Sequence, residues 1–196
     1  MDQPLGRAAG NAVEVAEAVE TLKGAGPSDT RELTLALTAE MTLLGGLHPD
    51  LASARRALAR LLDTGAALEV FRRMVVAQGG DPRFIDDAAR LPQPGAAVAV
   101  PAPKAGFVGF ADAEAVGRVV LQLGGGRTAT TDVIDPAAGV DRLVQAGEPV
   151  EKGQPLMRLL AKDASRAEAL VAAAAAAVQI ADAPPPARAL ILERIA

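Results

Sequence analysis

The sequence has no cysteine, no tryptophan and no tyrosine. The lack of cysteine excludes disulfide bonds, thiolate catalysis and thiolate metal sites. Nucleic-acid binding commonly uses aromatic rings for base stacking together with an excess of basic residues, whereas this chain has a formal net charge of −4. We therefore expect no nucleic-acid partner.

Long apolar runs are also missing. The N-terminus shows no basic segment followed by an apolar one, so no secretory signal is predicted. The longest weakly apolar run, residues 169–178, is too short and too rich in alanine to span a bilayer. Half of the 196 residues are nevertheless hydrophobic, which is enough for a substantial core. We expect a soluble, cytoplasmic protein with no membrane partner.

Residues 1–90 have a helical pattern. Apolar residues recur at spacings of three and four in four segments, and glycine- or proline-containing turns separate these segments. The first helix follows Asn11 and stops at Gly24. The second runs from about residue 30 to residue 44, with Ser28 or Asp29 as its expected cap. The third restarts at Pro49 and Asp50 and ends near residue 64, and the fourth stops at residues 79–80.

The composition changes at residues 91–103, LPQPGAAVAVPAP, where proline forbids helix and valine alternates with alanine as in a strand. We predict a linker here. Residues 104–196 read as α+β, with two helices among short strands. The strands are expected at residues 107–110, 143–144, 156–160 and 190–195. The helices are expected at residues 113–123, after Asp112, and at residues 165–181.

Two features invite a functional interpretation and have a simpler one. The triplet Gly124, Gly125 and Gly126 could cradle a phosphate, but it follows a helix, whereas phosphate loops follow a strand and open a helix. A helix-terminating turn is therefore the better interpretation. His48 is the sole histidine and has no matching nucleophile or acid pair, which favours a solvated turn residue over a general base.

The loop at residues 4–10 offers backbone carbonyls just before a helix whose second turn carries Glu17. Hard cations bind this mixture of carbonyl and carboxylate oxygens. The competing interpretation is that the glutamates of this helix form a solvated face.

A hairpin sequence at residues 147–156, GEPVEKGQPL, resembles a hairpin of biotinyl and lipoyl carrier domains. The lysines of the chain lack the flanking residues of a modified carrier lysine, so this motif indicates fold and not carrier chemistry. A non-enzymatic carrier or assembly module built on such a scaffold is our alternative hypothesis.

Several motifs occur in a fixed order along the chain. They are M-D-Q-P-L-G-R-A-x-G-N-A at the N-terminus, R-M-V-x-A-Q-G-G at residues 73–80, L-G-G-G-R at residues 123–127, D-x-I-D-P-A-x-G at residues 132–139 and G-x-x-V-E-K-G-x-P-L at residues 147–156. The series resembles the C-terminal part of thymidine phosphorylase and pyrimidine-nucleoside phosphorylase, from the first residue to the last.

This resemblance implies a homodimeric pentosyltransferase in which phosphate attacks the anomeric carbon of a pyrimidine nucleoside and releases the base and (deoxy)ribose 1-phosphate. It also implies that residues 1–90 are the helix-rich C-terminal part of an α/β domain. Residues 104–196 would then be a small β-rich, hammerhead-like C-terminal domain related to barrel-sandwich hybrids.

The family's phosphate loop and base-binding residues would precede the M-D-Q-P-L-G motif, and no sequence of that kind occurs in this chain. The resemblance therefore assigns no catalytic residue and no organic cofactor here, and we expect a truncated fragment that is inactive alone. It does imply part of a potassium site, formed by the carbonyls of Leu5 and Ala8 and the carboxylate of Glu17, with weak affinity. Apolar helix faces left uncovered would promote self-association or rearranged helical packing.

Overall fold

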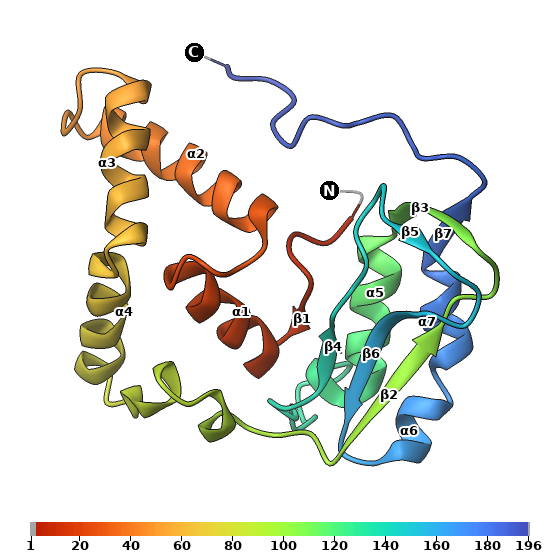
Figure 1. Ribbon diagram of the computed structural model, residues 1–196. Coiled ribbons are helices and arrows are strands. Elements are labelled where there is room, and N and C mark those ends of the chain that lie inside the picture. Colours follow the sequence, from red (N-terminus) through yellow and green to blue (C-terminus); the bar gives the residue numbers. More distant parts are fainter. Residues whose placement is uncertain (1–2, 196) are drawn as a thin grey trace. The chain divides into compact units, whose positions relative to one another are not determined.

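The computed structural model describes residues 3–195, so Met1, Asp2 and Ala196, which begin and end the predicted domains, lie outside the described residues. The chain divides into two compact units (Figure 1). The first comprises Met1–Val15 and Ala89–Ala187, and the second Ala16–Ala88 and Arg188–Ala196. The expected α+β class is confirmed. The division into domains at residues 91–103 and the hammerhead detail stay predictions.

The second unit is helical. Its elements are most of α1 (Ala12–Leu22), α2 (Ser28–Leu44), α3 (Leu51–Asp63), α4 (Ala66–Ala77) and the 3-10 turns η1 (Pro82–Ile85) and η2 (Ala88–Arg90). Asp50 caps α3 by accepting a hydrogen bond from the Ser53 amide at 2.7 Å, as its position before the apolar stripe indicates. The expected cap of α2 is wrong, because Pro27 holds the cap position without a side-chain hydrogen bond.

The first unit contains two antiparallel sheets. One has the strand order β1-β4-β6-β2, and in Figure 1 β4, β6 and β2 lie side by side; the other has the order β5-β3-β7. The strands are β1 (Ala9–Gly10), β2 (Ala96–Pro101), β3 (Gly106–Ala111), β4 (Gly139–Asp141), β5 (Pro149–Val150), β6 (Pro155–Ala161) and β7 (Val178–Ala181). The helices are α5 (Ala113–Val120), continued by the π-helical turn η3 (Leu121–Gly125), α6 (Ala164–Glu168) and α7 (Val171–Ala176).

A single large hydrophobic cluster forms the core of the first unit. Strand β6 supplies its centre because five of its seven residues are buried, in keeping with an apolar run between two neighbouring strands. Its largest fully buried side chains are Leu123, Leu143, Leu156, Met157, Leu159, Val100, Val108, Val116 and Val140.

Three predicted elements differ from the structure. The helix expected at residues 165–181 ends at Ala176, and Val178–Ala181 pairs with β3 as strand β7. The strand expected at residues 143–144 lies earlier, at β4, while Val144 donates its amide to the Leu156 carbonyl at 2.9 Å. The strand expected at residues 190–195 is wrong, because residues 182–195 form no helix or strand.

Candidate functional site

The start of helix α1 is fixed against strand β4 by two glycines. Gly10 and Gly139 are cross-strand partners, and Gly10 has a φ of +149°. A Cβ on Gly139 would lie 2.7 Å from the Ala9 carbonyl oxygen, and one on Gly10 would lie 2.8 Å from the Ala138 carbonyl oxygen. Only glycine permits this close backbone approach. The glycines of the motifs A-x-G-N and D-x-I-D-P-A-x-G therefore meet.

Hydrogen bonds complete the seat of α1. The Ala12 amide donates to the Pro136 carbonyl at 3.0 Å, and the Asn11 side-chain amide donates to the Gly125 carbonyl at 3.0 Å. Glu14 reaches back to accept from the Gly10 amide at 2.6 Å. The first-turn donors of α1 are thus engaged by protein groups, which reduces what this helix start offers to an anion.

The preceding loop is anchored to the hairpin that leads to β6. Arg7 donates to the Leu143 carbonyl at 3.2 Å and forms an ion pair with Glu148, while the Leu143 amide donates to the Arg7 carbonyl at 3.0 Å. This hydrogen-bonded ion pair holds the pKa of Glu148 below its ordinary value, mainly through the hydrogen bond from Arg7. The sequence analysis missed this pair because 141 positions separate the two residues.

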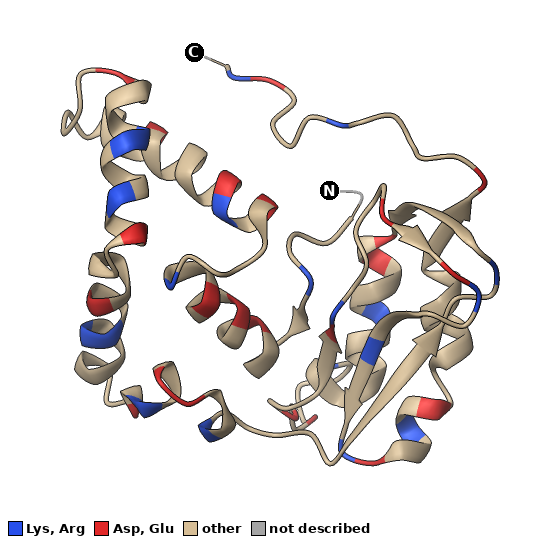
Figure 2. Cartoon of the chain, viewed as in Figure 1, with Lys and Arg blue, Asp and Glu red and all other residues tan. Residues whose placement is uncertain are grey.

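The residues of the predicted cation site fall in both units. Leu5 is 42% exposed in the loop, and Ala8 is buried just before β1. Glu17 is half-buried on α1, where its backbone carbonyl accepts a hydrogen bond from the Thr21 hydroxyl. Leu5 and Ala8 belong to the first unit and Glu17 to the second. Figure 2 shows the acidic residues that run along α1.

Among residues 3–195, no group of three or more histidine, cysteine, aspartate or glutamate side chains could hold a metal ion. That finding concerns side chains and leaves backbone carbonyl ligands untested. The cation site stays a prediction that rests on the chemistry of its donors.

The glycine triplet terminates a helix, as expected. Gly124 has a φ of +107°, at the end of the π-helical turn η3. Its carbonyl accepts a hydrogen bond from the Asp135 amide at 2.9 Å. A Cβ on Gly125 would lie 2.8 Å from a Val120 methyl carbon. The triplet thus folds the chain back and does not open a helix around a phosphate.

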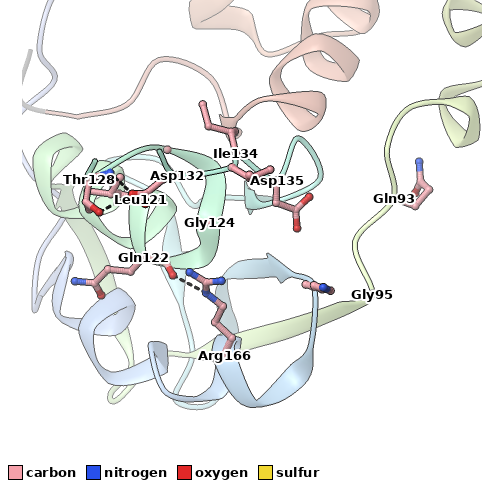
Figure 3. A pocket seen from close by; sticks show the side chains of 13 residues that line it. Gln93, Gly95, Leu121, Gln122, Gly124, Thr128, Asp132, Ile134, Asp135 and Arg166 are labelled. Atoms are coloured by element: carbon pink, nitrogen blue, oxygen red, sulfur yellow. Dashed lines mark hydrogen bonds between the residues drawn. The ribbon is translucent and has the colours of Figure 1, made fainter. Parts of the chain in front are cut away.

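A polar hollow of about 1010 Å³ lies in front of this turn (Figure 3). Arg166 reaches into it from α6 and donates its Nε to the Gln122 carbonyl at 2.8 Å. Lys162, Asp132 and Asp135 also line the hollow. Asp132 accepts from the Thr128 hydroxyl and from the Thr128 and Ala129 amides at 2.7 to 2.9 Å.

These bonds lower the pKa of Asp132, with the Thr128 hydroxyl as the largest cause. Asp132 therefore acts as an ionised staple of its loop and is a poor general base. Of the residues named from sequence for other reasons, His48 is half-buried in the turn between α2 and α3, and Lys152 is exposed at the turn between β5 and β6.

In the described part of the chain, every helix falls short of the length and apolar character that a membrane span requires.

Comparison with known proteins gives two family matches along the chain. The family described as "Glycosyl transferase family, a/b domain" matches residues 1–68, and the family described as "Pyrimidine nucleoside phosphorylase C-terminal domain" matches residues 107–181. The second match contains β3 to β7, and the first contains the loop, α1, α2 and α3.

Individual relatives agree with these matches. The pyrimidine-nucleoside phosphorylase of Bacillus subtilis is 44% identical over 161 residues, which is 82% of this chain and 37% of that protein. The thymidine phosphorylase of Burkholderia orbicola is 44% identical over 181 residues, which is 91% of this chain and 40% of that protein. The pyrimidine-nucleoside phosphorylase of Staphylococcus aureus is 42% identical over 159 residues. The chain spans about two fifths of the length of these curated relatives.

Proposed function

Since the chain belongs to the thymidine and pyrimidine-nucleoside phosphorylase family, we propose that it supplies the C-terminal portion of an enzyme that phosphorolyses pyrimidine nucleosides. In that reaction, inorganic phosphate attacks the anomeric carbon, the glycosidic bond breaks, and the products are the free base and the pentose 1-phosphate. The observation that carries the proposal is the ordered pair of family matches, together with 44% identity over 91% of the chain.

The described residues contribute scaffold to this reaction more than chemistry. The glycine triplet is a helix-terminating turn, Asp132 is saturated with donors, and the first-turn amides of α1 are already bonded within the protein. No phosphate-loop sequence of the family occurs in the chain. We therefore propose that the chain alone does not catalyse phosphorolysis. Cytoplasmic location and homodimer formation belong to the same proposal.

The test is an assay of base release from thymidine and uridine in the presence of phosphate. The chain alone should release no base above a no-enzyme blank. Co-expression with the complementary portion of the Bacillus subtilis relative should restore base release. Turnover by the chain alone would contradict the proposed inactivity, while a folded co-expressed pair without activity would count against the proposed assignment.

The potassium site is a further part of the proposal. Two neutral carbonyl oxygens, from Leu5 and Ala8, and one carboxylate, from Glu17, form a donor set that suits a hard monovalent cation. When bound, the ion would supply a positive charge that holds loop and helix ligands together. In the complemented enzyme, replacing sodium by potassium should raise the melting temperature, and Glu17→Gln should abolish the difference. An equal shift in Glu17→Gln would remove Glu17 from the ligand set.

Nothing in the fold or in the matched relatives supports the alternative hypothesis of a biotinyl or lipoyl carrier.

A further inference from the structure

The C-terminal segment, residues 188–195, leaves the unit in which the preceding strand lies. Strand β7 belongs to the first unit, yet Arg188–Ala196 group with the helical second unit. Over this stretch the described residues form neither helix nor strand. The segment's position is therefore not set by backbone pairing, and its side chains must account for its association with the helices.

One side-chain contact ties this segment to helix α2. Arg194 donates from Nε and Nη2 to the two carboxylate oxygens of Glu40, at 2.5 and 3.1 Å. This two-pronged geometry fixes the orientation of the guanidinium group as well as its distance. The hydrogen bond from Arg194 is also the main cause that lowers the pKa of Glu40.

The face of α2 around Glu40 is apolar and open. Leu37, Met41 and Leu44 are 56%, 68% and 87% exposed, and their spacings of four and three place them on one side of the helix. Glu40 lies between them in the sequence, three residues after Leu37. The Arg194–Glu40 contact therefore joins the segment to α2 at its exposed apolar face.

The segment carries matching apolar side chains. Ile191 and Leu192 precede Arg194 and Ile195 follows it, and these side chains are 45%, 90% and 91% exposed. An exposed ion pair by itself contributes little to the free energy of association. Apolar contact between the two exposed sets would add the larger stabilisation.

We infer that residues 188–195 form a strap that docks on the Leu37–Met41–Leu44 face of α2, with Arg194–Glu40 as its polar anchor. The structure shows the anchored strap with its apolar side chains still exposed. When the strap closes, it shields an apolar helix face and holds the C-terminus on the helical unit.

The test uses the full chain and two readouts: hydrogen exchange of the amides in residues 35–44, and thermolysin cleavage at residues 190–192. Arg194→Glu and Glu40→Arg should each raise both rates at least threefold, because each replaces attraction by repulsion. The exchanged pair, with both substitutions, should restore both rates. A matched control exchanges the exposed pair Arg118 and Glu114 on α5 and should leave both rates unchanged.

A second variant keeps the anchor and weakens the apolar contact. Ile195→Ser should accelerate cleavage while far-UV circular dichroism stays at the wild-type value. The inference is overturned if the single charge variants leave both rates unchanged or if the exchanged pair does not restore them. It is also overturned if protection of α2 depends on protein concentration and not on these variants, because a second copy of the chain would then be the occupant.

Discussion

The guanidinium group of Arg7 is bonded to the carboxylate of Glu148, so a loop near the N-terminus is held by a hairpin 141 positions later. Glu148 also accepts from the Gln145 amide at 3.0 Å. The pair joins the approach to α1 to the turn before β5, and a stability measurement can detect it.

The Arg7–Glu148 pair should make stability depend on pH. The pKa of Glu148 is lowered in the folded state, so its stabilising contribution is present above the unfolded value of about 4.3 and is lost as pH falls through the folded value. Because both side chains are about one-third exposed, we expect Glu148→Gln to cost about 0.5–1 kcal/mol at pH 7. Urea unfolding of both proteins from pH 7 to pH 3 should show the difference shrinking below about pH 4. Glu151→Gln, in the same hairpin, is the control, and a pH-independent difference would rule out the charged pair.

Gly124 should resist substitution, and Gly117 should not. Gly124 has a φ of +107°, so Gly124→Ala is expected to cost about 1–2 kcal/mol. Gly117 lies within α5, where an added Cβ would meet nothing within 4 Å. Gly117→Ala should therefore stabilise the protein by about 0.5–1 kcal/mol. Denaturant unfolding of the two variants should move in opposite directions, and equal effects would refute this account of the turn.

The core around β6 should dominate the stability of the first unit. Leu159 is fully buried at the centre of β6, so Leu159→Ala is expected to cost about 3 kcal/mol through lost burial and the cavity left behind. Val133, 92% exposed, gives the matched control, and Val133→Ala should stay within about 0.5 kcal/mol of wild type. Urea midpoints measure both, and a small effect at Leu159 would show that β6 is not central to folding.

Helix α4 should promote association of the isolated chain. Val70 and Met74 are 55% and 46% exposed, lie four residues apart on α4, and are part of an apolar surface on the helical unit. Light scattering should give a mass that rises with concentration, and Val70→Lys with Met74→Lys should reduce that rise. A monodisperse monomer for the unaltered chain would contradict the prediction.

Local signals allowed most helices to be predicted. Helix α3 could be placed because Asp50 and the apolar stripe that follows it act within one or two turns. The same holds for α5 after Asp112, whose side chain accepts from the Ala115 amide at 2.9 Å.

The errors occurred where partners lie far apart in the sequence. Val178–Ala181 follows an alanine-rich stretch that favours helix, and its strand conformation depends on pairing with Phe107 to Ala111. Strand β4 was misplaced because its position depends on the approach of Gly139 to Gly10. Likewise, the contact between Arg194 and Glu40, 154 positions apart, has no local signature in the sequence.

The strand order β1-β4-β6-β2 also bears on how the chain is made. Ala9 pairs with Val140, so β1 has no partner until about 130 more residues have been synthesised. At 5–20 residues per second this delay is roughly 7–26 s. Residues 16–88 emerge completely within that interval, so the helical unit can begin to fold as a continuous insert before the sheet closes. Synthesis therefore exposes the N-terminal strand for longer than any other part of that sheet.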